Sequence, residues 1–400
     1  PRLSRSSIDF DGLEVQPGDD PPVPFSFRTA RLDVQQLPCW RTATNERTHA
    51  VVREHAERSP MFRGRIRGVG PRYCPSIEDK VARFAEQPAH AVFLEPEGRE
   101  SDEIYPNGVS TSLPADVQLA FLRTIRGLEQ VEVVRPGYAV EYDYVLTRQL
   151  RGDLQIAGVA GLFAAGQING TSGYEEAAGQ GIVAGRNAAR FARGEEPAVI
   201  DRATGYLGVM IDDLCRVNPE EPYRMFTSRA EFRLLLRSDN ADRRLTPLGE
   251  RWGLVAAGQA DAVRAKEARI RAALRWLDRG RHERRPLRDW LRRPEVTAAD
   301  VVAQDPTFAA MALTPAELAE VEAEVKYEGY VRRQALEVER LRRLESRRIP
   351  TRFDYGRIPG LSVEARARLD QRRPLTLGEA SRTAGVRQAD VQLLLVALER

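Results

Sequence analysis

The spacing of apolar positions divides this chain of 400 residues into three regions. In residues 1–148, short apolar runs such as AVFLEPEG, VEVVRPGYAV and VEYDYVL are rich in β-branched and aromatic residues and are separated by Pro and Gly. Such runs are typical of strands, so we expect a mixed sheet with a few helices here. Residues 206–400 carry apolar positions at helical spacing, as in AEFRLLLR and VQLLLVALER, which predicts an α-helical domain.

The middle region, residues 149–205, predicts a strand, a tight turn and a helix. The strand is GLFAAG, the turn is QINGTSG and the helix is YEEAAGQGIVAGRNAARFA. Gly166, Gly170 and Gly173 permit a close approach of the backbone to a ligand. The N–H groups and positive dipole end of the helix suit a phosphate or an electron-rich ring. A well-capped α/β crossover that binds nothing explains the same pattern equally well.

A further helix is predicted to begin at about residue 76. Pro75 is suited to a helix start, and Ser76 with Asp79 forms a capping-box pattern. Cys74 would then lie at the positive end of this helix, where the thiolate form is favoured. The alternative is that Cys74 is a small buried apolar residue.

Composition excludes several classes of protein. The three cysteines show neither CxxC spacing nor clustering with histidine, which argues against a disulfide framework and a metal site and fits the cytoplasm. No apolar run approaches the roughly 18 residues of a membrane span, and no signal-peptide pattern is present. The net charge of +3 is too small to predict a polyanion partner by itself. The nearest match to a dinucleotide fingerprint, GVGPRY, lacks the third glycine.

Long stretches of the chain closely resemble the bacterial glucose-inhibited division protein A family. They are GPRYCPSIEDK, AGQINGTSGYEEAAGQGIVAGRNA, EPYRMFTSRAEFRLLLRSDNADRRL, VKYEGYVRRQ and SRTAGVRQADVQLLLVAL. Family members are the large subunit of an enzyme that modifies tRNA uridine, and they carry an additional amino-terminal portion whose Rossmann fingerprint binds the FAD adenylate. The resemblance therefore identifies this sequence as an amino-terminally truncated fragment.

The resemblance implies an α/β fold in three parts. An incomplete FAD-binding Rossmann-type domain, like that of glutathione reductase, would carry an inserted mixed α/β domain and be followed by an α-helical C-terminal domain. The inserted domain would span residues 1–148 and hold the nicotinamide site and the catalytic cysteine. Residues 149–205 would close the FAD-binding domain, and residues 206–400 would bind tRNA and a partner GTPase.

The resemblance also implies site residues, by position. Cys74 matches one of two catalytic cysteines, and because the other belongs to the additional portion, this chain alone is expected to be inactive. The nicotinamide-contacting stretch comprises Gly70, Pro71, Arg72, Tyr73, Cys74, Pro75, Ser76, Ile77, Glu78, Asp79, Lys80, Val81, Ala82, Arg83 and Phe84. The FAD-contacting positions are Gly166, Gln167, Asn169 and Gly170.

For tRNA phosphates we expect a cluster of arginines: Arg224, Arg229 and Arg233. Their spacing would place at least the last two on one helix face, and guanidinium forks suit phosphate. The alternative is ion pairing of these arginines with the nearby acids Glu231, Asp239 and Asp242.

The implied reaction adds an aminomethyl or carboxymethylaminomethyl group at C5 of the wobble uridine of certain tRNAs. It would use FAD, NADH and methylene-tetrahydrofolate, in a homodimer that forms a heterotetramer with the GTPase. A thiolate that adds to C6 of uracil makes C5 nucleophilic, which fits an activated Cys74. Two alternatives remain: a related FAD- and folate-dependent tRNA uridine-5-methyltransferase, which lacks the long helical extension, and a non-catalytic module that binds tRNA and the partner.

Overall fold

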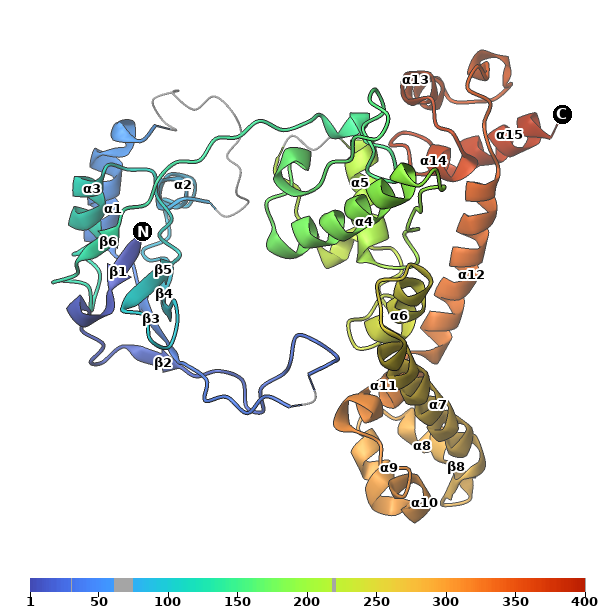
Figure 1. Cartoon of the computed structure of the whole chain (residues 1–400), viewed down its shortest axis with the longest axis horizontal. Coiled ribbons are helices and arrows are strands. Elements are labelled where there is room, and N and C mark those ends of the chain that lie inside the picture. The colour runs from blue at the N-terminus through green and yellow to red at the C-terminus, as the bar shows by residue number, and fades with distance from the viewer. Residues whose placement is uncertain (30, 61–74, 218–220, 400) are drawn as a thin grey trace. The chain divides into compact units, whose positions relative to one another are not determined.

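The computed structural model describes residues 1–29, 31–60, 75–217 and 221–399. The chain forms two compact units. The first contains residues 1–201 and 207–226, and the second contains residues 202–206 and 227–400. Figure 1 labels the elements of both units.

The first unit contains a sheet of six strands in the order β2-β3-β4-β5-β1-β6. Their bounds are β1 Arg2–Ser4, β2 Glu14–Gln16, β3 Cys39–Ala43, β4 Ala91–Pro96, β5 Glu103–Asn107 and β6 Val133–Arg135. The predicted strands AVFLEPEG and VEVVRPGYAV contain β4 and β6. Every pairing among these strands is antiparallel, so the prediction of a mixed sheet is wrong.

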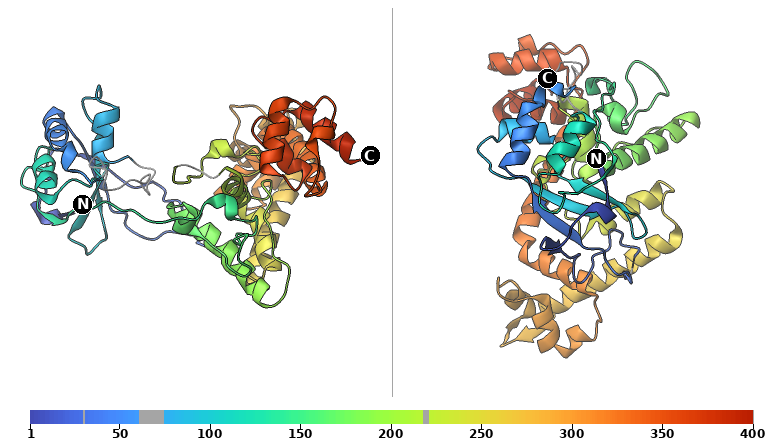
Figure 2. Two further views of the ribbon diagram at one scale, coloured as in Figure 1. Left: turned by 90° about the horizontal axis from the view of Figure 1, so that it is seen from above. Right: turned by 90° about the vertical axis from the view of Figure 1, so that its left-hand side faces the viewer.

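Three helices contribute side chains to the same core as this sheet (Figure 1; Figure 2, right). They are α1 Glu46–Glu54, α2 Ile77–Arg83 and α3 Ala115–Leu122. Burial alternates along β4, where Val92 and Leu94 are buried while Ala91 is exposed. This alternation is the period of two that a sheet with one buried face requires. The core therefore holds α2 firmly against the sheet.

The remainder of the first unit contains α4 Tyr174–Ala192, most of α5 Tyr206–Val217 and the 3-10 turn η4 Gly166–Asn169. The prediction of α4 is confirmed at both ends. The predicted strand GLFAAG is wrong: Phe163 forms only an isolated bridge, with Gln155. VEYDYVL is not a strand either. The N–H of its Val145 donates to the carbonyl of Ile168 in the glycine turn, at 2.8 Å. Both segments use their backbone groups within local loops instead of a sheet.

The second unit is helical, as the sequence predicts, and an α/β fold followed by a C-terminal helical domain is confirmed. Its helices are α6 Ala241–Arg251, α7 Ala257–Arg279, α8 Leu287–Leu291, α9 Ala298–Gln304, α10 Pro306–Ala309, α11 Pro315–Lys326, α12 Glu328–Ser346, α13 Val363–Arg372, α14 Leu377–Ser381 and α15 Gln388–Leu398. The short strands β7 Arg281–His282 and β8 Arg285–Pro286 form a hairpin. One apolar cluster joins α7, α8, α9 and α11, and another joins α13, α14 and α15.

The predicted helix AEFRLLLR is wrong, because residues 230–237 form turns. The backbone here forms isolated turns: the N–H groups of Leu235 and Leu236 donate to the carbonyl of Phe232, at 3.0 and 2.9 Å. The N–H of Leu235 also donates to Oε1 of Gln334, at 3.2 Å. Within the described ranges, no helix combines the length and the hydropathy that a membrane crossing needs.

Candidate functional site

The start of α2 is built as the sequence predicts. The hydroxyl of Ser76 accepts the N–H of Asp79 at 3.1 Å, and the carboxylate of Asp79 accepts the N–H of Ser76 at 3.2 Å. This reciprocal pair is a capping box, which fixes where the helix begins. The predicted nicotinamide stretch is described from Pro75 to Phe84. Gly70, Pro71, Arg72, Tyr73 and the predicted catalytic Cys74 lie outside the described residues.

Several side chains of this stretch hold the fold together. Ile77 and Val81 are core residues. Glu78 is buried and accepts both the N–H and the hydroxyl of Ser112, at 3.0 and 3.2 Å. Lys80 donates to the carbonyl of Gly108, at 2.8 Å. Through these contacts α2 positions the loop of residues 108–112.

Two histidines that the sequence did not single out lie together in this unit. The rings of His49 and His90 are 5.2 Å apart, and Nε2 of His49 is 2.8 Å from the hydroxyl of Thr44. Burial lowers the pKa of both imidazoles, and the charge of the other histidine lowers that of His49 further. The sequence offered no signal for this pair, because 41 positions separate two ordinary histidines and only the sheet brings them together.

The glycine turn has the left-handed backbone that favours glycine. Gly166 has φ +77° and Gly170 has φ +67°. A Cβ on Gly170 would lie 3.5 Å from the ring of Tyr144, and a Cβ on Gly166 would lie 3.4 Å from Ala177. Backbone strain, more than lack of space, therefore requires glycine at these two positions.

One buried side chain of α4, that of Gln180, holds the turn. Oε1 of Gln180 accepts the N–H of Gly166 at 2.9 Å and a side-chain N–H of Asn169 at 3.0 Å. Asn169 also donates to the carbonyl of Ala164, at 2.8 Å. Oδ1 of Asn169 is buried and has no hydrogen-bond partner within the described ranges. Sequence reasoning missed Gln180; its signal was a polar side chain on the face of α4 that also carries Glu176, Val183 and Asn187.

Glu176 occupies the beginning of α4. A Cβ on Gly173 would collide with its carboxylate, so any other residue there would displace the side chain of Glu176. The carboxylate accepts the N–H of Met225 at 3.1 Å and lies 3.6 Å from Nε of Arg224. An anion at this helix end would therefore meet a carboxylate already in place.

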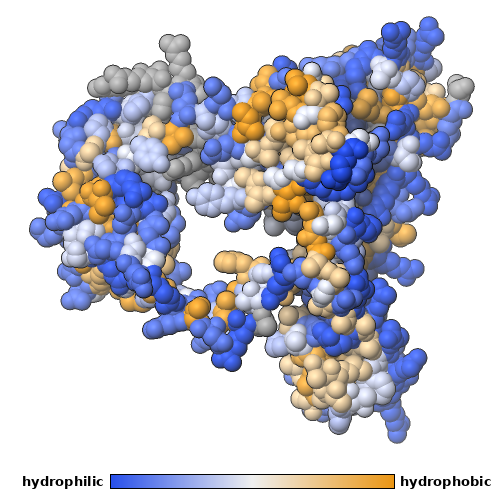
Figure 3. All heavy atoms as spheres, in the orientation of Figure 1, coloured by the Kyte–Doolittle hydropathy of each residue, from blue (hydrophilic) through white to orange (hydrophobic). Residues whose placement is uncertain are grey.

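Around the turn, exposed apolar side chains gather. Ile168 and Tyr174 are 43% and 88% exposed, and Ile182 on α4 is 55% exposed. Figure 3 shows hydrophobic residues concentrated over the part of the first unit that contains α4 and α5. Together with the exposed Gln167, these residues offer an apolar surface beside a turn without side chains at Gly166 and Gly170.

The three arginines of the predicted cluster belong to two different compact units. Arg224 belongs to the first unit, whereas Arg229 and Arg233 belong to the second. The expectation that Arg229 and Arg233 share a helix face is wrong, because their segment is not a helix. Arg233 is exposed and has no ion-pair partner among the residues that the structure describes.

The acids suggested as partners for these arginines are engaged by other cations. Arg202 contacts Glu231 at 3.0 Å, Arg237 contacts Asp239 at 2.9 Å, and Lys266 contacts Asp242 at 2.8 Å. Because these acids already form ion pairs with other cations, ion pairing with them does not explain the position of Arg233.

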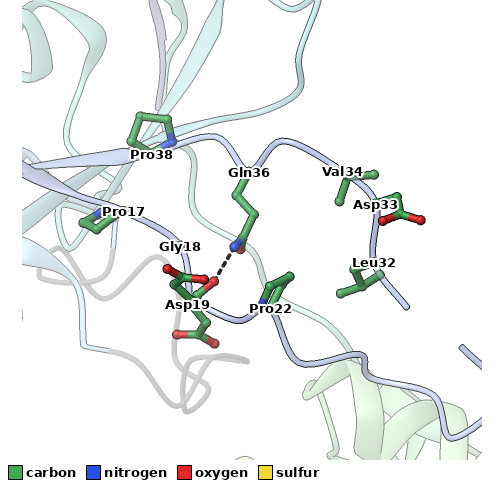
Figure 4. Close-up of a pocket in the computed structure, with 10 residues that line it drawn as sticks. Pro17, Gly18, Asp19, Pro22, Leu32, Asp33, Val34, Gln36 and Pro38 are labelled. Carbon is green, nitrogen blue, oxygen red and sulfur yellow. Dashed lines mark hydrogen bonds between the residues drawn. The ribbon is translucent and has the colours of Figure 1, made fainter. Parts of the chain in front are cut away.

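A hollow of about 580 Å³ lies in the loop of residues 17–38 (Figure 4). Prolines and aspartates supply much of its lining, and the side chain of Gln36 donates to the carbonyl of Asp19, at 2.5 Å. The hollow contains no pairing of a nucleophile with a base, so it adds no candidate for catalysis.

Three family models match the chain. The model of glucose inhibited division protein A matches residues 1–196. Models of the C-terminal helical domain and of the C-terminal helical bundle of the tRNA modifying enzyme MnmG/GidA match residues 259–335 and 337–400.

Individual relatives align with the whole chain. The tRNA uridine 5-carboxymethylaminomethyl modification enzymes MnmG of Geobacter metallireducens and Syntrophotalea carbinolica are 51% and 50% identical to it over its entire length. The chain spans 66% and 67% of the length of these two proteins. The structure of Aquifex aeolicus GidA superposes with a TM-score of 0.86 at 42% identity, and the match covers 100% of this chain and 66% of that one. The chain belongs to the glucose inhibited division protein A family.

Proposed function

We propose that this chain is part of an FAD-dependent enzyme that adds an aminomethyl or carboxymethylaminomethyl group to C5 of the wobble uridine of certain tRNAs. The observation that carries the proposal is the 51% identity, over the full chain, to a relative named for this modification. Since the chain spans 66% of that relative's length, the activity is proposed for the full-length protein, including the part that this chain does not span.

The glycine turn fits a large planar cofactor such as FAD. Gly166 and Gly170 are buried and shape the turn, Ile168 and Tyr174 offer apolar contact, and Oδ1 of Asn169 is a buried acceptor without a partner among the described residues. Gln167, Asn169 and the two glycines would hold the cofactor, and Gln180 would keep the turn in shape. When bound, FAD supplies hydride chemistry that no amino-acid side chain provides.

The proposed role of Cys74 is covalent. Its thiolate adds to C6 of the uracil ring, and the electron pair moves to C5, which then attacks the one-carbon unit. Loss of the C5 proton and departure of the thiolate restore the double bond and leave the new group on C5. The capping box at Ser76 supports this proposal, because it fixes a helix start two residues after Cys74.

The remaining parts of the proposal rest on the family resemblance. They are NADH as reductant, bound along the stretch from Gly70 to Phe84, and methylene-tetrahydrofolate as one-carbon donor. They also include a homodimer that joins a GTPase in a heterotetramer, in the cytoplasm. Arg224, Arg229 and Arg233 remain proposed contacts to tRNA phosphates, and the exposure of Arg233 supports its assignment. The helical domains of residues 259–400 count against a uridine-5-methyltransferase.

The test is Cys74→Ser in the full-length protein, with Cys39→Ser as the matched control because Cys39 lies on β3. Mass spectrometry of nucleosides from tRNA should show complete loss of the modified uridine for Cys74→Ser and wild-type amounts for the control, with flavin absorbance unchanged in both. Normal modification by Cys74→Ser would refute the catalytic role. A full-length protein that binds tRNA but no flavin would favour the non-catalytic alternative.

A further inference from the structure

Tyr144 lies against the glycine turn, in a segment that the proposed reaction does not use. The N–H of the next residue, Val145, donates to the carbonyl of Ile168 at 2.8 Å, and this bond fixes the segment to the turn. The ring of Tyr144 lies beside Gly170, because a Cβ built on Gly170 would be 3.5 Å from Cδ2 and 3.9 Å from Cε2 of that ring. One edge of the ring is therefore held by the turn that carries the predicted FAD contacts.

The remainder of the ring faces solvent. Tyr144 is 45% exposed, and its hydroxyl has no hydrogen-bond partner among the residues that the structure describes. Gly170 itself is buried. A ligand beside this part of the turn would therefore meet the exposed ring of Tyr144.

Two aliphatic side chains lie next to the hydrogen bond that joins the segment to the turn. Ile168, whose carbonyl accepts that bond, is 43% exposed, and Leu146, which follows Val145, is 37% exposed. A single exposed apolar side chain is ordinary on a protein surface. Here an aromatic ring and two aliphatic side chains occur at one junction, beside a turn whose two glycines have positive φ. Such a surface suits a flat aromatic ligand, since aromatic pairs attract each other beyond the area that they bury.

We propose that Tyr144 forms an aromatic wall of the FAD site and contacts the ring system of the cofactor. The inference rests on the proposed function, because it takes FAD as the ligand of the glycine turn. It deepens that function by assigning a cofactor contact to residues 144–146, which lie outside both the turn and α4. The hydrogen bond from Val145 places the ring before the cofactor binds, so little conformational freedom is lost on binding.

The fluorescence of bound flavin tests this contact, because a tyrosine ring in contact with flavin quenches it. The phenol transfers an electron to the photoexcited flavin, which then returns it. Phenylalanine is not oxidised in this way, so Tyr144→Phe in the full-length protein should lengthen the fluorescence lifetime of the flavin and leave its affinity close to that of wild type. Tyr144→Leu, which removes the ring, should weaken FAD binding about 3- to 10-fold.

Tyr138→Phe is the matched control. Tyr138 precedes Tyr144 in the same loop and is 67% exposed, but no atom of it lies within 4 Å of a Cβ built on Gly166 or Gly170. Its replacement should leave both the lifetime and the FAD affinity at wild-type values. Hydrogen exchange at Gly170 is measured in each variant, because a purely structural role of Tyr144 would change this exchange and leave the lifetime unaltered.

The outcomes separate the inference from the proposed function. If wild type binds FAD and Tyr144→Phe leaves the lifetime unchanged, the inference is overturned and the proposed function stands. Weaker binding by Tyr144→Leu with that unchanged lifetime would assign Tyr144 to the shape of the turn alone. Equal lengthening by Tyr144→Phe and Tyr138→Phe would also overturn the inference, because the effect would not depend on contact with the turn. A full-length wild type without flavin would overturn the proposed function, and the inference with it.

Discussion

Replacement of Gln180 by leucine tests whether one buried amide keeps the glycine turn in shape. Gln180 is fully buried, and its Oε1 accepts two hydrogen bonds, from Gly166 and Asn169. Leucine has a similar size but no acceptor, so the N–H of Gly166 loses this partner. Asn169 keeps its bond to the carbonyl of Ala164. An orphaned buried donor costs about 1–3 kcal/mol, so we expect the closed turn to lose about 2 kcal/mol.

Hydrogen exchange is the suitable assay, because a chain of two compact units does not have a single free energy of unfolding. A loss of about 2 kcal/mol corresponds to roughly 30-fold faster exchange at Gly166 and its neighbours. Gln167→Leu is the matched control: the same amide lies on the same turn but is exposed, so exchange should stay close to wild type. In the full-length protein, Gln167→Leu should instead weaken FAD binding. Wild-type exchange at Gly166 in Gln180→Leu would show that the amide does not hold the turn.

Three further predictions concern stability. Because the pKa values of His49 and His90 lie below their ordinary value of 6.5, the unfolded chain binds protons that the folded first unit does not, so stability should fall as the pH drops from 7 to 5. Thermal unfolding of His90→Gln should show a flatter pH dependence, and an unchanged slope would count against the histidine pair. Ser76→Ala should cost α2 about 1 kcal/mol, measured as faster exchange in residues 77–84, and Ser76→Thr should retain most of the protection. Gly181→Ala should slow exchange along α4 by the equivalent of about 0.5–1 kcal/mol, because a Cβ there meets no atom within 4 Å; faster exchange would reveal a hidden contact.

Local patterns in the sequence predicted local structure well. Ser76 and Asp79 are three positions apart, and their reciprocal hydrogen bonds depend on little else, so the helix start at α2 is confirmed. The bounds of α4 follow similarly from Gly173 and from the glycine after Arg193. The resemblance correctly identified the family because it rests on long motifs that match as continuous stretches of sequence.

The errors come from segments whose apolar spacing does not match how their backbone groups are paired. AEFRLLLR has the apolar spacing of a helix, but its backbone forms turns at Phe232, and the N–H of Leu235 also donates to Gln334, which lies 99 positions away. GLFAAG has the composition of a strand, yet Phe163 forms only a bridge to the nearby Gln155. Apolar spacing reports which side chains are buried and does not report which backbone groups are paired. For the same reason, the sequence did not reveal that the amide of Gln180 pairs with the glycine turn.

The two faces of α4 differ in the contacts that their residues make. On the buried face, Glu176 holds the backbone of Met225, Gln180 holds the glycine turn, and Asn187 holds the carbonyls of Asp153 and Ala198. These contacts explain why polar residues occupy a buried helix face, since each amide or carboxylate satisfies loop groups that would otherwise lack partners. On the opposite face a Cβ at Gly181 or Gly185 would meet nothing within 4 Å, so packing in the described structure does not require glycine there. Glycine in a helix interior destabilises the helix by about 1 kcal/mol relative to alanine. No contact at Gly181 or Gly185 in the described part of the first unit compensates for this loss. A close approach by a group outside the described residues would explain the small residues of that face, and Gly181→Ala tests it in the full-length protein.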